Sequence, residues 1–462
     1  MLDGAVAARI LRPLWRAALL ALLVPLIMLL GASLVDAQSA PSISSSQASV
    51  QFPEGIRFNL EAQAPGEIER VQLRYTILPD GVPTNTVADC APPSGATISC
   101  SVLVRGNDPP RIYIPPFTEL RYSWEVVPTE GPTARSEEQS VVYTDTRFEW
   151  AQQSEANLTI YSYGNTDAAA LLSAGRAALD RTSSLLATPV SFPVKVVAYA
   201  SREDMAAALQ NRSATFGELV VTLGVRVSSD TVIVLNDEGA VATLQHELAH
   251  VVTKQAGEGT LGGLPAWLDE GTAVYAQDNV DFGYLTAYEN AVESDSLLSL
   301  RAMSSPTGNP ENVNLFYGQS YAFVRYLVDT YGEERFAQLF ATFKAGARVD
   351  EALQDVYGKD LLELENEWRA ALGLPPRSVE EARAEAERTA TFTPLGAGGI
   401  ALPSTPDAAD GEDDAGRPVE SNDDDDDDGV DGATVAVIAV AAVAALGATA
   451  GGGVALYRYR RR

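Results

Sequence analysis

The sequence predicts an α+β protein with an N-terminal β-sandwich, a mixed domain of strands and helices, and a C-terminal transmembrane helix. Three observations support this prediction: short alternating strands over residues 42–145, strands followed by helices from residue 155 onward, and an uncharged apolar run near the C-terminus. The chain has 462 residues, of which 46% are hydrophobic. That length accommodates about two to three domains.

Residues 1–37 are typical of a signal peptide. Three arginines, the last of them Arg16, precede the apolar stretch Ala17–Leu30, and Val35-Asp36-Ala37 offers a small-residue cleavage site. An uncleaved signal anchor is the alternative. Both interpretations place the following domain outside the membrane.

Alternating hydrophobic residues continue through the predicted sandwich, residues 42–145. The alternation is clear in Ile56–Ala62, Val71–Ile77 and Arg121–Val126, with proline and glycine between the strands. This pattern resembles fibronectin type III or immunoglobulin domains. We expect such a module to act as a spacer or to present substrate.

Cys90 and Cys100 are the only cysteines. A close pair in an exported chain predicts one disulfide that joins two strands. Neither lies near the histidines in the sequence, so we do not expect sulfur to bind a metal.

The domain predicted over residues 155–390 begins with alternating strands and helices and is mostly helical beyond Ala276. Its expected strands are Leu158–Tyr163, Val194–Tyr199 and Thr231–Leu235, and its first helices are Asp167–Leu186 and Arg202–Gln210.

His246 and His250 are the only histidines, and they enclose Glu247 in the sequence His-Glu-Leu-Ala-His. On a helix, positions i and i+4 share a face, so both rings can reach one metal ion. Glu247 is then placed to act as general base on a water bound to that ion. No surplus of histidines exists from which this spacing could arise by chance.

A catalytic zinc site needs a third protein ligand and an open position. Glu270 follows His250 by twenty residues, after a glycine-rich segment and Pro265, which suits the first turn of a second helix. Two antiparallel helices would bring Glu270 opposite the histidines. The simpler interpretation of Glu270 is a solvated helix carboxylate.

HELAH followed by Pro265-Ala266-Trp267-Leu268-Asp269-Glu270-Gly271-Thr272-Ala273-Val274-Tyr275 resembles the gluzincin zinc metallopeptidases of the peptidase MA-like group. Leu315–Leu327 resembles a downstream helix of that family, and the resemblance covers about residues 155–375. It implies a gluzincin-type fold, with Zn²⁺ held by His246, His250 and Glu270 and with Glu247 as the general base. It also implies that an edge strand within residues 219–235 pairs with the substrate backbone.

The sequence departs from the family pattern at three places. Thermolysin-type enzymes use a further histidine, which this chain lacks, and Val274 replaces the aspartate that normally contacts the first histidine. Asp269 and Asp278 are the alternatives for that contact. The Gly-x-Met-Glu-Asn stretch of M1 aminopeptidases is also missing, which favours an endopeptidase.

A tyrosine is the natural replacement for the missing histidine as the donor that stabilises the oxyanion. The resemblance points to Tyr317 or Tyr321. Both tyrosines also fit ordinary packing positions on an amphipathic helix.

The C-terminal region divides into three segments. Residues 391–432 form an acidic linker, with 13 acidic residues and one arginine between Ser404 and Asp431. Like charges repel, so we expect an extended spacer rather than a calcium site. Residues 433–456 carry no charge and predict a transmembrane helix, for which a buried alanine-rich helix is the alternative. The basic residues 457–462 indicate a cytoplasmic tail.

These features predict a membrane-anchored, extracytoplasmic zinc metallopeptidase, an endopeptidase acting on peptides or proteins, with its C-terminus in the cytoplasm. The alternative is a cell-surface binding or adhesion protein with an inactive peptidase-like domain, and an aminopeptidase is a third option. The net charge is −29, and no basic residues are clustered enough to suggest nucleic acid as a partner.

Overall fold

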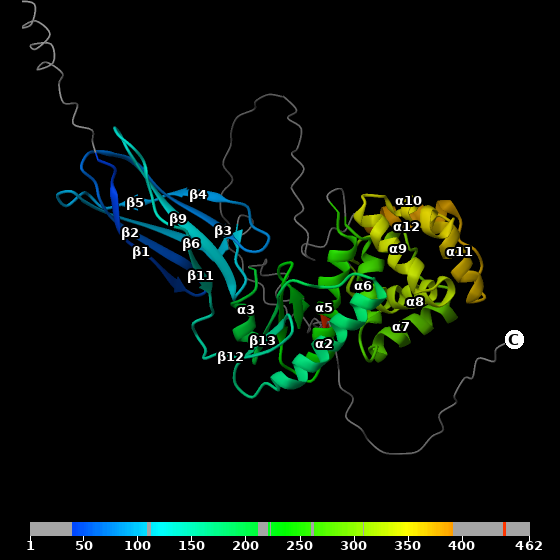
Figure 1. The fold of residues 1–462 in the computed structure, drawn as a ribbon. Helices are drawn as coiled ribbons and strands as arrows, with labels where there is room; N and C mark the ends of the chain where they lie inside the picture. The colour runs from blue at the N-terminus through cyan, green and yellow to red at the C-terminus, as the bar shows by residue number, and fades with distance from the viewer. Residues whose placement is uncertain are drawn as a thin grey trace, which may run out of the picture.

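The computed structural model describes residues 39–108, 112–210, 220–221, 223–259, 263–307, 309–390 and 438–439. Within them a β-sandwich, a mixed sheet and a group of helices follow one another across the molecule (Figure 1). The predicted signal peptide (1–37), acidic linker (391–432) and basic tail (457–462) lie outside the described residues.

The sandwich consists of two antiparallel sheets. One has the order β1 (Ser42–Gln51), β2 (Gly55–Gln63), β6 (Thr97–Arg105) and β5 (Asp89–Cys90). The other has the order β10 (Ala134–Arg135), β9 (Thr118–Pro128), β3 (Ile68–Ile77) and β4 (Thr84–Val87), with β11 (Gln139–Tyr143) also paired to β9. Alternate residues of both sheets point inward, and Phe58, Leu73 and Trp124 are completely buried between them. β7 (Asn107–Asp108) and β8 (Ile112–Tyr113) form a small separate pair.

The predicted disulfide is present. Cys90 on β5 lies opposite Cys100 on β6, and their sulfurs are bonded. The bond joins the short edge strand β5 to the sheet.

The third sheet is mixed, with the order β12 (Ala151–Glu155), β13 (Leu158–Ser162), β14 (Val194–Tyr199), β17 (Thr231–Leu235) and β16 (Gly224–Arg226). β13, β14 and β17 run parallel, and the two edge strands are antiparallel to their neighbours. α2 (Ala168–Leu185) carries the chain from β13 to β14, and such a helical crossover makes successive strands parallel. The predicted α+β class was therefore wrong here, because strands and helices form one mixed α/β unit.

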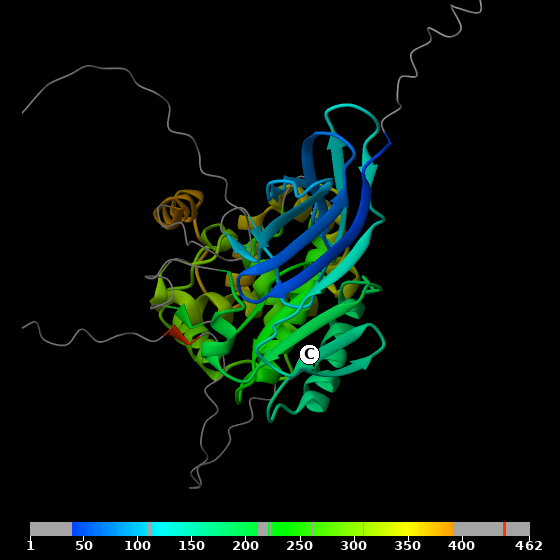
Figure 2. The ribbon, with the colours of Figure 1, turned by 90° about the vertical axis from the view of Figure 1, so that its left-hand side faces the viewer.

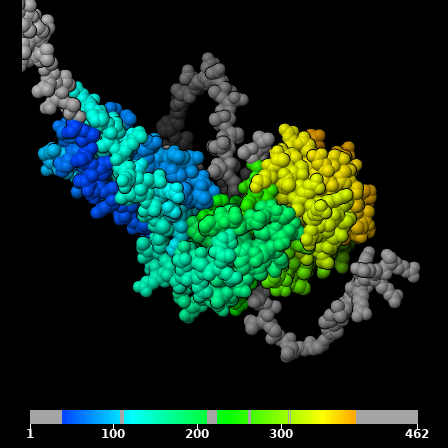
Figure 3. Space-filling model, in the orientation of Figure 1, coloured from blue at the N-terminus to red at the C-terminus, as the bar shows by residue number. Residues whose placement is uncertain are grey.

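The remaining helices pack beyond this sheet, on the side away from the sandwich (Figures 1 and 3). They are α5 (Ala240–Gly257), α6 (Ala266–Tyr275), α7 (Phe282–Glu293), α8 (Val313–Tyr331), α9 (Glu333–Lys344), α10 (Val349–Tyr357), α11 (Leu361–Ala371) and α12 (Val379–Ala390), with the short 3₁₀ helices η1 (Ala302–Ser304) and η2 (Pro310–Asn312). α3 (Arg202–Ala206) lies between β14 and β17 in the chain and ends earlier than the predicted helix 202–210.

The sandwich packs directly on the mixed sheet, as the view from the sandwich side shows (Figure 2). The ring of Phe117 stacks on Tyr161 with centroids 3.8 Å apart, and Lys195 Nζ donates a hydrogen bond to the Phe117 carbonyl. Tyr113 donates its hydroxyl to the carbonyl of Ala208 on the other side of the boundary. These apolar and polar contacts fix the sandwich against the sheet.

The prediction of a C-terminal transmembrane helix over residues 433–456 was wrong. In the part of the chain that the structure describes, no helix has the length and apolar character needed to cross a bilayer. Of the predicted span, only residues 438–439 are described, and they form a strand, β18 (Ile438–Ala439), parallel to β15 (Val220–Val221). The absence of charge does not select a helix, and β-branched residues such as Ile438 and its valine neighbours favour strands.

Candidate metal centre

α5 carries both histidines on one face and its packing residues on another. Leu244 and Leu248 are completely buried, and Leu248 packs against α2 at Gly175, where a Cβ atom would lie 3.0 Å from Leu248 Cδ1. The leucines and the histidines each have i, i+4 spacing, so each pair lines up along the helix. Burial of the leucine face thus directs His246 and His250 toward α6.

α6 begins directly after Pro265, whose missing N–H costs nothing at a helix start. The helix packs against both α5 and α8. Contact with α8 requires Gly271, since a Cβ atom there would lie 2.4 Å from the carbonyl oxygen of Ser320. This close approach places Glu270, the preceding residue, between the histidines and α8.

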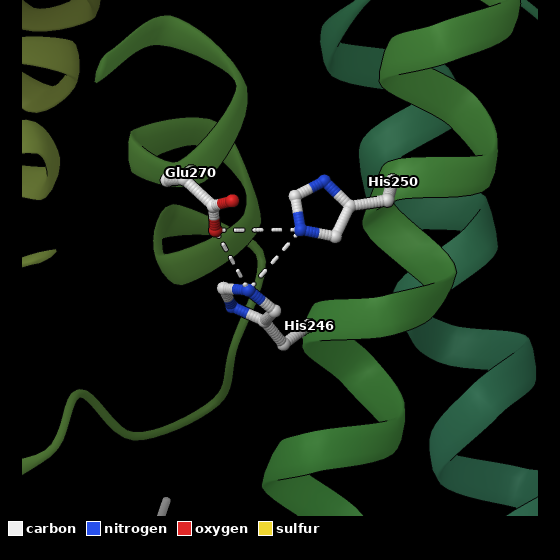
Figure 4. A group of neighbouring side chains, drawn as sticks. All are labelled: His246, His250 and Glu270. Carbon is white, nitrogen blue, oxygen red and sulfur yellow. Dashed lines mark hydrogen bonds and ion pairs between the residues drawn. The ribbon is translucent and has the colours of Figure 1, made fainter. Parts of the chain in front are cut away.

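The three predicted ligands converge, as Figure 4 shows. Glu270 Oε2 lies 3.1 Å from His246 Nε2 and 3.4 Å from His250 Nε2, and the two Nε2 atoms are 3.2 Å apart. All three side chains are largely buried.

This geometry fits a zinc ion. In a tetrahedral site with bonds of roughly 2.0–2.1 Å, neighbouring ligand atoms are about 3.3–3.4 Å apart. The three separations found here are close to that value, and two imidazoles with one carboxylate form a ligand set that zinc accepts. Three protein ligands leave a fourth position for water or substrate.

The carboxylate of Glu270 is held in its ionised form. Burial by itself raises the pKa of Glu270, but the charge of His250 and hydrogen bonds from both imidazoles outweigh burial and lower it to about 2. An ionised carboxylate is the form that binds a metal.

Asp269 contacts the second histidine of the pair. Its Oδ1 lies 3.1 Å from His250 Nδ1 and accepts a hydrogen bond from Thr253 Oγ1, while its Oδ2 lies 2.8 Å from Lys254 Nζ. Burial raises the pKa of Asp269, but His250 and Lys254 together bring it well below the ordinary value. When Nδ1–H donates to this carboxylate, the lone pair of Nε2 faces the metal position.

The sequence left Asp269 and Asp278 as alternative partners of His246. In the structure Asp269 contacts His250 instead, and Asp278 has other partners. Asp278 accepts a hydrogen bond from Gln245 Nε2 and pairs with Arg181. Thr253 and Lys254 were missed by sequence reasoning. Lys254 follows His250 by four residues, and that i, i+4 spacing was the available signal.

Glu247 lies beneath an edge strand of the mixed sheet. Its Oε2 accepts a hydrogen bond from the backbone N–H of Arg226 on β16, at 2.9 Å. Of the predicted edge segment 219–235, only β16 is the edge of this sheet, whereas β17 is an interior strand paired on both sides. Residues 211–219 and 222 lie outside the described residues.

The two candidate tyrosines on α8 face different surroundings. The Tyr317 ring lies 5.9 Å from the His246 ring, centroid to centroid, and stacks on Tyr284. Burial, reinforced by the negative charge of Glu270, raises the pKa of Tyr317 well above the ordinary value, so the phenol stays protonated. Tyr321 lies one turn later, packs against Tyr275 and contributes to a surface cavity with Tyr288.

The part of the chain that carries this centre is similar to known proteins. Residues 174–373 match the family model of the Peptidase MA superfamily. The chain is also 29% identical over 167 residues to the alanine/arginine aminopeptidase of Saccharomyces cerevisiae. That match covers 30% of this chain and spans only 19% of the yeast protein.

Two similar solved structures come from bacteria. An aminopeptidase N family protein from Idiomarina loihiensis has 9% sequence identity and a TM-score of 0.34, covering 73% of this chain and 76% of its own. An M1 zinc metallopeptidase from Deinococcus radiodurans has 12% identity and a TM-score of 0.30, covering 73% of this chain and 94% of its own.

Proposed function

Because residues 174–373 belong to the Peptidase MA superfamily, we propose that this chain is a zinc metallopeptidase that hydrolyses peptide bonds at the centre formed by His246, His250 and Glu270. The observation that carries the proposal is the convergence of the three ligand atoms at separations suited to one tetrahedral ion.

A zinc ion held by these residues would supply Lewis acidity and would lower the pKa of a bound water molecule. The roles of the protein's own side chains follow from where they lie around the metal centre. Glu247 accepts the proton of the attacking water and later passes it to the leaving amine. The protonated hydroxyl of Tyr317 donates a hydrogen bond to the carbonyl oxygen as negative charge develops there.

The exposed edge of the mixed sheet is the surface that binds the substrate backbone in this proposal. β16 pairs only with β17 among the described residues, so its other edge has no strand partner there, and on that strand the backbone N–H of Arg226 is bonded to Glu247. An extended peptide that adds to this edge gains main-chain hydrogen bonds and brings a scissile bond to the metal centre.

We assign endopeptidase rather than aminopeptidase activity. An aminopeptidase needs negative charge to bind the free α-ammonium group of its substrate. The Gly-x-Met-Glu-Asn stretch of M1 aminopeptidases, which contains a glutamate, is missing from this sequence. Peptides with acetylated N-termini should therefore be cleaved at internal bonds, and cleavage restricted to free N-termini would contradict the assignment.

The disulfide supports folding in an oxidising compartment outside the cytoplasm, because cytosolic proteins rarely keep such bonds. Alkylation of thiols in cells that produce the protein, followed by mass spectrometry, should find Cys90 and Cys100 protected. Free thiols at both positions would argue against this location.

The central experiment compares the wild-type protein with Glu247→Gln. Both should contain one zinc ion per chain, since Glu247 is not a ligand, and only the wild type should cleave a mixed peptide library. We expect the loss to be about 10²–10⁴-fold. If both proteins bind zinc and neither cleaves any peptide, the alternative of a binding protein with an inactive centre is favoured. A folded chain that binds no zinc would contradict the proposal altogether.

A further inference from the structure

A cavity of about 510 Å³ lies beside the metal centre, at the C-terminal end of α5. Its floor comes from α5 and its walls come from four other parts of the chain: the segment before β14, the β16–β17 region, the end of α9 and the sandwich. Its lining includes Pro79, Arg226, Ser229, Asp230, Val251, Lys254, Glu258 and Lys344.

The cavity continues the helix face that carries the catalytic residues. Val251, Lys254 and Glu258 follow Glu247 at steps of three or four residues, the spacing of one helix face. Lys254 also contacts Asp269, the partner of His250. The nearest of these lining residues, Val251, therefore lies about 6 Å beyond Glu247 along the helix axis.

β16 extends along the same face. A Cβ atom at Gly224 would meet Thr243 Cγ2 and Glu247 Cγ, so position 224 faces α5. Side chains two residues apart on a strand point the same way, so Arg226 also faces α5, one turn further along, at Val251 and Lys254. Arg226 lines the cavity, and its guanidinium donates to the carbonyl of Ser228, next to the lining residue Ser229.

The cavity lining carries more positively charged than negatively charged side chains. The carboxylate of Asp230 pairs with Lys195, and Lys254 pairs with Asp269 and Glu258. Arg226 donates to the carbonyl of Ser228 and Lys344 to the carbonyl of Gln255. Among the described residues, neither of these two cations forms a salt bridge to a carboxylate, although the whole chain carries a net charge of −29.

We propose that this cavity is a substrate subsite that holds an acidic side chain of the peptide, bound through the guanidinium of Arg226 with support from Lys344. The proposal rests on the proposed peptidase function and specifies its substrate class. A guanidinium binds a carboxylate through two parallel hydrogen bonds, which gives both strength and direction. The apolar wall contributed by Pro79 and Val251 packs against the methylene groups of the same side chain.

The sandwich takes part in this subsite and is more than a spacer. Pro79 lies in the loop between β3 and β4, and the neighbouring Asp80 accepts a hydrogen bond from the backbone N–H of Ser229, at 2.9 Å. That bond fixes the sandwich loop against the β16–β17 turn. The wall opposite α5 is thus supplied by the N-terminal domain.

The test measures selectivity on the full chain. A peptide acetylated and amidated at its ends is first cleaved and the scissile bond mapped by mass spectrometry. Each position around that bond is then compared as Glu and as Gln. At one position the wild type should show up to about a fivefold higher kcat/KM for Glu, the factor that a single favourable ion pair of about 1 kcal/mol supplies.

Three variants of cavity residues should change the Glu/Gln ratio of kcat/KM, two of them lowering it and one raising it. Arg226→Gln and Lys344→Gln should each lower the Glu/Gln ratio, with the ratio for Arg226→Gln near one. Glu258→Gln removes an anion from the same cavity and should raise the ratio. The matched control is Arg202→Gln on α3, an exposed arginine away from the cavity, which should leave the ratio unchanged.

The possible outcomes distinguish a failure of the proposed subsite from a failure of the proposed peptidase function. Cleavage with a Glu/Gln ratio near one at every position would overturn the subsite and leave the peptidase function intact. A preference that appears only with a free C-terminal carboxylate would also overturn it, because the bound group would then be the chain end. No cleavage of any peptide would overturn the proposed function and the subsite with it.

Discussion

Asp269 Oδ1 lies 3.1 Å from Nδ1 of His250, the ring nitrogen that does not face Glu270. Asp269 directly precedes the ligand Glu270 on α6. One turn of α6 therefore supplies both a metal ligand and the group that orients another ligand. Lys254 and Thr253 hold the same carboxylate from α5, so the orientation is set by two helices.

We predict that Asp269→Ala weakens zinc binding about 10–100-fold, because the His250 ring loses the contact that fixes its orientation. Competition with a chromophoric chelator measures the affinity. Asp278→Asn is the control, since Asp278 contacts Gln245 and Arg181 rather than an imidazole. Equal zinc affinities for Asp269→Ala and the wild type would show that the contact is dispensable.

Tyr317→Phe should lower kcat about 10²–10³-fold and leave bound zinc stoichiometric, because it removes a donor to the developing oxyanion without touching a ligand. Steady-state kinetics and metal analysis of the same sample measure both quantities. Tyr321→Phe, one turn away on α8, should retain most activity. The assignment fails if the Tyr321 variant loses more activity than the Tyr317 variant.

The raised pKa of Tyr317 predicts its titration. Burial and the nearby carboxylates disfavour the phenolate, so this residue stays protonated beyond pH 10.0, the ordinary midpoint. The ultraviolet difference spectrum between wild type and Tyr317→Phe should show no phenolate signal up to that pH in metal-free protein. A phenolate difference that develops near pH 9 would contradict the direction of the shift.

Gly271→Ala should destabilise the fold by about 1–3 kcal/mol, since the added methyl group would lie 2.4 Å from the Ser320 carbonyl and force α6 from α8. Urea denaturation followed by circular dichroism measures the free energy of unfolding. The control is Gly263→Ala, where the nearest atom is 3.9 Å away, and it should be close to neutral. Similar losses in both variants would show that helix packing is not the cause.

Replacing both Cys90 and Cys100 by serine should cost about 3 kcal/mol, because the bond closes a short loop in the unfolded chain. Thermal unfolding with and without a reductant measures the effect, and the reductant should change only the wild type. Since the bond is confined to the sandwich, zinc content at low temperature should stay unchanged.

The sequence by itself determined the local features of this protein. The spacing of His246 and His250 places both on one helix face, and the flanking glycines and Pro265 predict a second helix that carries Glu270. The strands Val194–Tyr199 and Thr231–Leu235 coincide with β14 and β17, because alternation and runs of β-branched residues depend only on neighbours in the chain.

Tertiary structure decided the rest, because contacts between distant segments leave no periodic signal in one sequence. The pairing of Asp269 with His250 depends on how α6 packs against α5, and the separation of Tyr317 from Tyr321 depends on the rotation of α8 about its axis. The parallel order of the inner strands follows from the crossover through α2. The error at residues 433–456 has a related cause. Apolar composition indicates that a segment prefers nonpolar surroundings, but it does not indicate whether the backbone N–H and C=O groups pair within a helix or with another strand.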